Sequence, residues 1–311
     1  MKSYFRELSV AGALAILLLV LAIFAPSFYS PQPLLSLSAG AAGSLVVACG
    51  MALVIISRQI DISVGSMFAV CSVCAGLLAA MHWPLALVVA ASIFIGAIFG
   101  AFNGTLVAGL GLPSIVVTLA TMVTWREGLR WLRQGEFVNL PEGIQWFGLS
   151  QKSGQWALVI GALGILTLLA FMMKHFSIGR FIYAVGSDAE VARLSGIRPK
   201  LTTFLIFVLM GALVGLAAIM NIVQSPQVDP QSGTGLELKV IAAVVVGGVA
   251  ISGGRGNLWG VFAGLLLLAC ISPALTHLHI EAYWEKAIQG SIILLAVVAE
   301  GLRNQKSSNH G

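Results

Sequence analysis

Ten long apolar runs constrain what this chain can fold into more than any other feature of its sequence. A helix needs about twenty consecutive apolar residues to cross the hydrocarbon core of a bilayer. Charged residues make up only 9% of the chain, whereas soluble domains carry about 25%. The sequence therefore predicts an all-α, polytopic membrane protein with about ten transmembrane helices in one domain, residues 1–311. The expected spans are about residues 9–25, 38–56, 63–81, 85–106, 114–131, 156–173, 202–223, 238–251, 258–275 and 283–301.

The distribution of lysine and arginine predicts how these helices are oriented. Cytoplasmic loops of membrane proteins carry an excess of both residues. If both termini lie in the cytoplasm, eleven of the 17 Lys and Arg residues fall on that side and six fall outside. We therefore expect cytoplasmic N- and C-termini. The fifth run is interrupted by Arg126 and Glu127, and the eighth is short and rich in glycine.

One polar segment, GRFIYAVGSDAEVARLSGIRPK at residues 179–200, stands out from the apolar chain. Within it, S-D-A-E from Ser187 to Glu190 fits a capping box, in which Ser187 accepts a hydrogen bond from the backbone of Glu190. Gly196 is placed to end the helix in a left-handed cap. We expect a helix at about residues 188–195. Such a short helix is marginal alone, so it either docks on a partner or packs on its own bundle as an ordinary surface helix.

The same segment carries a resemblance to a known family. It resembles the cytoplasmic coupling loop of permease subunits in ATP-driven importers of monosaccharides, a family that includes ribose, xylose, galactose, rhamnose and autoinducer importers. Asp188 stands where the family usually has asparagine, and Val191 replaces an alanine. The residues that match the family pattern are Gly179, Arg180, Tyr183, Ala184, Gly186, Ala192, Gly196 and Ile197.

Four further stretches resemble this family in the same order, so the resemblance covers nearly the whole chain. The first has Arg58 and Gln59 where glycines are usual. A fifth stretch, WREGLRW after the fifth apolar run, resembles the rhamnose branch most and the autoinducer branch next. The four stretches are RQIDISVGS (58–66), FNGTLVAGLGLPSIVVTLATM (102–122), GTGLELKVIAAVVVGG (233–248) and GGRGNLWGVFAGLLLL (253–268).

The resemblance implies a permease subunit of an ATP-binding cassette importer in the bacterial inner membrane. Its substrate would be a monosaccharide of the rhamnose or ribose type, or a sugar-like autoinducer. The implied partners are a second permease copy or homologue, a cytoplasmic ABC ATPase, a periplasmic sugar-binding protein and membrane lipid, without nucleic acid. The chain itself is expected to have no catalytic site, cofactor or metal, since ATP hydrolysis belongs to the partner.

The resemblance also implies that residues 174–201 form the loop that couples the permease to the ATPase. This is the part of the chain on which the energy of ATP hydrolysis would act. The residues expected to contact the ATPase or to shape the contact are Gly186, Ser187, Asp188, Ala189, Glu190, Ala192, Arg193, Leu194 and Gly196.

Three polar residues are candidates for the substrate pathway or its gate. Asp61 lies between the second and third spans, where it either caps the next helix or contacts the ATPase or the pathway. Asn103 and Thr118 lie in the fourth and fifth spans. Polar side chains inside spans either bond a neighbouring helix or line a water path. The sequence leaves these alternatives open for all three residues.

Two glycine-rich patterns remain ambiguous. Gly256, Gly260 and Gly264 form a doubled G-x-x-x-G, which suits close helix crossing either inside the bundle or between two copies. ISRQIDISVG (56–65) and ISGGRGNLWG (251–260) share an isoleucine, a serine and the final glycine at one offset. This echo indicates either an internal repeat or chance similarity between glycine-rich segments.

A different class of protein, a secondary transporter driven by an ion gradient, is the alternative. Such transporters place acidic residues inside the membrane as coupling sites, and this chain has almost none away from the ends of its spans. The chain also lacks a G-x-x-x-x-G-K loop, so it cannot hold ATP in the P-loop manner. Both observations favour a permease that depends on a separate ATPase.

Overall fold

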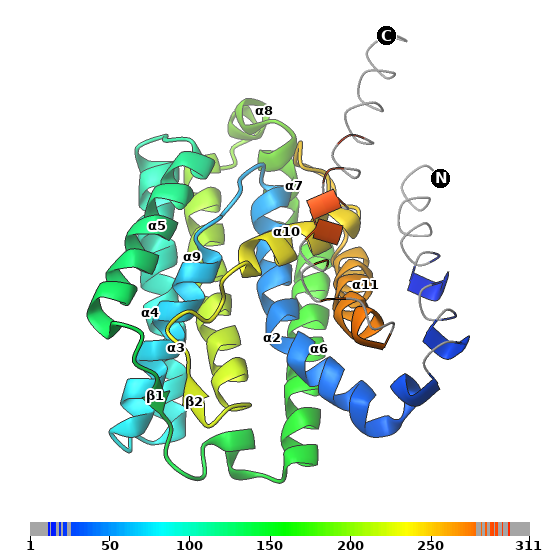
Figure 1. Ribbon diagram of the computed structural model, residues 1–311. Coiled ribbons are helices and arrows are strands. Elements are labelled where there is room, and N and C mark those ends of the chain that lie inside the picture. Colours follow the sequence, from blue (N-terminus) through cyan, green and yellow to red (C-terminus); the bar gives the residue numbers. More distant parts are fainter. Residues whose placement is uncertain are drawn as a thin grey trace.

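The computed structural model describes residues 26–277 continuously, with scattered residues between 12 and 23 and between 281 and 298. The described part is a bundle of long helices (Figure 1), with the short helices α7 and α8 at one end and a two-stranded sheet at the other. In chain order the elements are η1 (Pro26–Tyr29), α2 (Pro31–Ile56), α3 (Val64–Ala80), α4 (Leu85–Gly104), η2 (Thr105–Gly109), α5 (Ser114–Arg133), β1 (Val138–Asn139), η3 (Gln145–Gly148), α6 (Gln151–His175), α7 (Ser177–Ser187), α8 (Ala189–Leu194), α9 (Pro199–Ile222), β2 (Gln227–Val228), α10 (Leu236–Val246) and α11 (Leu258–His277).

The expectation of a helical, multi-pass membrane protein is confirmed. Five described helices, α2, α4 with η2, α6, α9 and α11, are long and apolar enough to cross a bilayer. Helices α3, α5 and α10 occupy three other expected spans, and α10 is short, with 11 residues. The expected spans 9–25 and 283–301 lie mostly outside the described residues. The expected loop 174–201 holds a helix that the sequence analysis missed, α7, which has 11 residues.

Helix α2 is the centre of the bundle. Nearly all of its last sixteen residues are buried, and it packs against α6, α9, α10 and α11. Helix α3 packs against α4, α5 and α9, and β1 lies against α3. At the end of the molecule opposite α7 and α8, β1 and β2 pair antiparallel with Val138 facing Val228. The most buried helix therefore runs toward the end where α7 and α8 lie.

Helices α4 and α9 pack so closely that glycines form the contact. A Cβ added at Gly96 would overlap the carbonyl oxygen of Gly211, and one at Gly100 would overlap that of Phe207. Small residues at four-residue spacing let membrane helices approach in this way. The G-x-x-x-G formed by Gly96 and Gly100 is the local sequence signal for this contact.

The doubled G-x-x-x-G at the start of α11 lies inside the bundle. A Cβ at Gly264 would overlap the carbonyl oxygen of Ala243, and one at Gly247 would lie 2.6 Å from the oxygen of Gly260. These glycines therefore pack α11 against α10. The sequence left open whether these glycines pack helices inside the bundle or between two copies. For Gly260 and Gly264, the structure shows packing inside the bundle.

Gly96→Ala should destabilise the protein, because the added Cβ meets backbone atoms that cannot rotate away. Overpacking of this kind costs about 1–3 kcal/mol. The matched control is Gly161→Ala on α6, where a Cβ meets nothing within 4 Å. There the better helix propensity of alanine should stabilise by up to about 1 kcal/mol. Thermal unfolding of the purified protein in detergent should shift in opposite directions; equal shifts would contradict the contact between α4 and α9.

Candidate functional site

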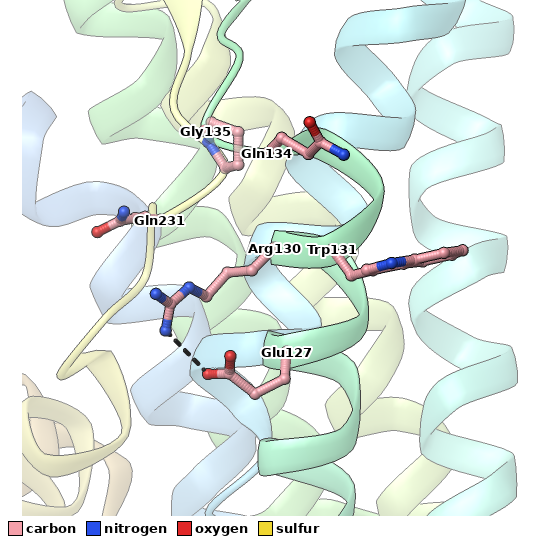
Figure 2. A pocket seen from close by; sticks show the side chains of 7 residues that line it. Glu127, Arg130, Trp131, Gln134, Gly135 and Gln231 are labelled. Atoms are coloured by element: carbon pink, nitrogen blue, oxygen red, sulfur yellow. Dashed lines mark hydrogen bonds and ion pairs between the residues drawn. The ribbon is translucent and has the colours of Figure 1, made fainter.

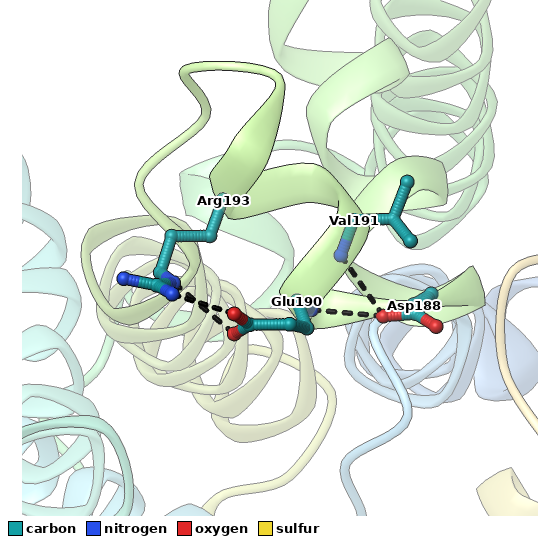
Figure 3. A network of polar contacts seen from close by, with 4 residues as sticks. All are labelled: Asp188, Glu190, Val191 and Arg193. Carbon is teal, nitrogen blue, oxygen red and sulfur yellow. Dashed lines mark hydrogen bonds and ion pairs between the residues drawn. The ribbon is translucent and has the colours of Figure 1, made fainter.

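The polar segment at one end of the bundle consists of two helices, α7 and α8, joined at Asp188. The Asp188 backbone is extended, with φ −158°, and its Oδ1 accepts hydrogen bonds from the backbone N–H groups of Glu190 at 2.9 Å and Val191 at 3.0 Å (Figure 3). The prediction that Ser187 caps α8 was therefore wrong, because the capping residue is Asp188. Because α7 continues through Ser187, that residue is helical and Asp188 takes the position that a cap requires.

Glu190 does not reach back to the start of its own helix. Its carboxylate accepts two hydrogen bonds from the Arg193 guanidinium, which lies one turn later on α8 (Figure 3). These bonds lower the pKa of Glu190. Both side chains are exposed, and exposed pairs add little to stability. The pair therefore fixes the shape and charge of the α8 surface more than it holds the fold together.

The C-terminal end of α8 follows the prediction. Gly196 has φ +82°, its N–H donates to the carbonyl oxygen of Arg193, and the N–H of Ile197 donates to that of Ala192. This bonding ends a helix in a left-handed glycine cap. The predicted role of Gly196 as the helix stop is therefore confirmed.

The residues of α8 expected to contact the ATPase do not share one face. Ala192 is buried, with 3% of its surface exposed, whereas Val191 is 58% and Leu194 76% exposed. Ala189 is exposed as well. A partner that docks on α8 would therefore meet Val191 and Leu194, while Ala192 packs inward on the protein itself.

Helix α7 joins α8 to the end of the central helix α2. The carbonyl oxygen of Ile56 accepts a hydrogen bond from the N–H of Gly254 at 2.8 Å. A Cβ at Gly186 would overlap the same oxygen, so only glycine lets α7 come this close. The Tyr183 hydroxyl donates to the carbonyl oxygen of Gly256 at 2.8 Å. Three segments distant in sequence thus meet at Ile56.

The connection after α2 begins with a residue in the conformation that glycine prefers. Arg58 has φ +64°, and the N–H groups of Arg58 and Gln59 donate back to the carbonyl oxygens of Ile55 and Val54. The end of α2 therefore has the left-handed backbone conformation that glycine usually provides where a helix ends. The resembled family usually has glycine at this position. A non-glycine residue there carries backbone strain, which this chain retains next to the Ile56 contact.

The three polar residues proposed for the pathway come together around this connection. Asp61 Oδ1 accepts hydrogen bonds from the N–H and the hydroxyl of Ser63, at 2.9 and 2.6 Å. The Asn103 amide on α4 donates to the same hydroxyl at 2.9 Å. The Thr118 hydroxyl on α5 accepts from the N–H of Ile62 at 3.1 Å. The connection between α2 and α3 is thereby bonded to both α4 and α5.

This polar cluster is closed in the present conformation. Asp61, Asn103 and Thr118 are each 0% exposed, and burial raises the pKa of Asp61 to about 6. Asp61 Oδ2 and Asn103 Oδ1 have no hydrogen-bond partner among the described residues. Here the three side chains hold helices together, and a role in the pathway remains a prediction. Asn103 lies two residues before the start of the π-helical turn η2, a distortion that is frequent at functional sites.

A polar pocket that the sequence analysis missed lies toward the opposite end of the bundle. It has a volume of about 450 Å³ between the last turns of α5 and the loop before α10 (Figure 2). Arg130 and Glu127 form an ion pair of 3.1 Å within it, and Arg126 donates to the carbonyl oxygen of Ser232 at 3.0 Å. Of the two charges that interrupt the fifth apolar run, Glu127 lines this pocket, and Arg126 bonds the loop before α10 at Ser232. Its lining is Glu127, Arg130, Trp131, Gln134, Gly135, Pro230 and Gln231.

Comparisons with known proteins agree with this geometry. The family model described as branched-chain amino acid transport system / permease component matches residues 34–297. The autoinducer 2 import system permease protein LsrC of Enterobacter sp. (strain 638) is 34% identical over 98% of this chain and 89% of its own. The ribose import permease protein RbsC of Escherichia coli (strain K12) is 31% identical over 96% of this chain and 95% of its own. No solved structure matches the chain.

Asp188→Ala should loosen the start of α8, because two backbone N–H groups lose their acceptor. The loss of such a cap costs about 1 kcal/mol, so hydrogen exchange at the Glu190 and Val191 amides should accelerate about fivefold. Ser187→Ala is the matched control, since its hydroxyl accepts neither bond, and it should leave both rates unchanged. Equal acceleration by the two substitutions would show that Asp188 is not the cap.

Proposed function

This chain belongs to the branched-chain amino acid transport system / permease component family, and on that premise we propose that it is the membrane-spanning subunit of an ATP-driven importer. The relatives that it resembles over nearly their whole length are named for ribose and autoinducer 2 import. A monosaccharide or a sugar-like autoinducer is therefore the proposed substrate. A rhamnose-type sugar is included in this proposal only because WREGLRW resembles the rhamnose branch of the family.

The observation that carries the proposal is the continuous contact from α8 to the interior of the bundle. Val191 and Leu194 offer an exposed apolar face at the end of the molecule. Behind them, Gly186 rests on the end of α2 at Ile56. An ATPase that pushes on α8 would therefore move the end of α2, and with it the connection that Asp61 ties to α4 and α5. This path gives the coupling loop 174–201 a physical route to the helices.

The opposite end suits a soluble partner that delivers substrate. The pocket beside Glu127 and Arg130 is open, charged and lined by an aromatic side chain, Trp131. Charged rims of this kind steer and orient a docking protein. We assign this end to the periplasmic sugar-binding protein.

The orientation, the assembly and the location complete the proposal. Ten spans with both termini in the cytoplasm would place α8 inside the cell and the Glu127 pocket outside, in a bacterial inner membrane. In Figure 1, α7 and α8 lie at one end of the bundle and β2, from which the loop before α10 starts, lies at the other, as this arrangement requires. A second permease copy or homologue would complete the pathway, and the partner ATPase would hydrolyse ATP.

The energy source distinguishes this proposal from the alternative, a secondary transporter driven by an ion gradient. The buried carboxylate of Asp61 is the feature of this chain that fits the alternative. In proteoliposomes that contain the ATPase, with binding protein and sugar on the opposite side, uptake should require ATP and should survive a proton ionophore. Uptake by this chain alone, driven by an ion gradient and abolished by Asp61→Asn, would favour the secondary transporter.

Leu194→Glu should uncouple the permease from its ATPase, because it puts a charge into the exposed apolar face of α8 and leaves both caps intact. We expect normal insertion into the membrane, but co-purification of the ATPase and sugar uptake reduced more than about tenfold. The matched control is Leu149→Glu, since Leu149 is 54% exposed and lies outside the α7–α8 segment. The control should keep the ATPase bound; normal uptake by Leu194→Glu would sink the coupling assignment.

A further inference from the structure

An apolar pocket lies behind α7, on the same end of the bundle as α8 but apart from the face just described. Its volume is about 420 Å³. Helix α6 contributes Met172, α7 contributes Ile178 and Phe181, and α9 contributes Leu201 and Leu205. Of these side chains, all but Met172 are more than a third exposed. The pocket is therefore an open groove that no described part of the chain covers.

The start of α9 brings positive charge to this groove. Arg198 lines the groove and directly precedes α9, and no side chain caps the helix there. The hydroxyl of Thr202 is engaged elsewhere, since it donates to the carbonyl oxygen of Arg198. Free N–H groups at a helix start attract anions. Arg198 and the exposed Lys200 add two cations at the same place.

The acidic side chains of α8 have partners of their own. Asp188 is occupied as the cap of α8, and Glu190 is paired with Arg193. An apolar groove lined by Arg198, at a helix start without a side-chain cap, is complementary to one chemistry: an anionic headgroup attached to a hydrocarbon chain.

We propose that this groove binds an anionic phospholipid of the cytoplasmic leaflet, with its acyl chain along Phe181 and Leu205 and its phosphate at Arg198 and the start of α9. The proposal rests on the orientation given under the proposed function. Basic residues near the cytoplasmic surface attract anionic lipids in general; here an adjoining apolar groove supplies the second contact that makes a defined site.

The neighbouring surface favours lipid over a protein as the occupant. Helix α6 leads into the groove and exposes a series of large apolar side chains along its length, including Ile160, Leu168 and Phe171. Such a face is expected to contact lipid in a membrane protein. Because the groove continues this face, lipid can enter from the side. The ATPase, in contrast, is assigned to Val191 and Leu194 of α8.

Native mass spectrometry of the purified full-length chain, with phosphatidylglycerol or phosphatidylcholine added, tests the proposal. We expect retention of phosphatidylglycerol in preference to phosphatidylcholine. Arg198→Gln should weaken phosphatidylglycerol retention about fivefold and remove most of the preference. Leu205→Trp, which fills the groove, should weaken retention of both lipids. The matched control is Arg180→Gln, because Arg180 bonds Ser177 and does not line the groove; it should bind as the unaltered chain does.

Unchanged phosphatidylglycerol retention in both Arg198→Gln and Leu205→Trp would overturn the proposal. So would a Leu205→Trp protein that keeps its lipid but loses its ATPase or a second permease copy, because a protein would then be the occupant. Lipid retention is measured without transport, so a failure of the importer assignment would appear in uptake and ATPase binding and would leave the lipid result standing.

Discussion

The carbonyl oxygen of Ile56 is the contact on which the α7–α8 end of this protein depends. The last carbonyl groups of a helix lack partners within the helix, and this one is satisfied by the N–H of Gly254. Gly186 of α7 packs against the same oxygen without room for a side chain. The buried helix α2, the glycine-rich connection before α11 and the α7–α8 segment are therefore joined at one point, and none can move without the others.

From that point, polar bonds carry the connection into the bundle. The chain between α2 and α3 is held by Ser63, Asn103 and Thr118 around the carboxylate of Asp61. Buried hydrogen bonds of this kind are costly to break singly, so the connection is expected to move as a unit with α4 and α5. The strained Arg58 at its start adds a second conformational constraint at the same place. Rigid contact at Ile56 and a bonded connection behind it are what a coupling device requires.

The two segments that echo each other in sequence share one backbone feature at matching positions. Arg58 and Gly253, each the third residue of its segment, have positive φ, and their N–H groups donate to the carbonyl oxygens of Ile55 and Ala250. Each segment then leads into the next helix, α3 or α11. The Ile56–Gly254 bond joins the two segments to each other.

The sequence predicted the helical membrane class, described helices in eight of the ten expected spans, the short helix α8 and the Gly196 cap, because these depend on local composition and turn chemistry. The sequence-based prediction took Ser187 as the cap of α8 because it did not include α7, whose last residue is Ser187. Helix α7 was readable from the spacing of Ile178, Phe181, Ile182 and Val185. The meeting of Asp61 with Asn103 and Thr118, the Ile56 contact and the two pockets join residues far apart in sequence, and no local pattern encodes them.

Hydrogen exchange at the Ile60 and Ile62 amides tests the coupling path most directly. Their N–H groups donate to the hydroxyls of Ser114 and Thr118, so they report whether the connection stays bonded to α5. In the transporter assembled with its ATPase, a non-hydrolysable ATP analogue should change exchange at both amides together with exchange in α8. A change in α8 with Ile60 and Ile62 unaffected would contradict the account, because force on α8 would then reach the helices by another route.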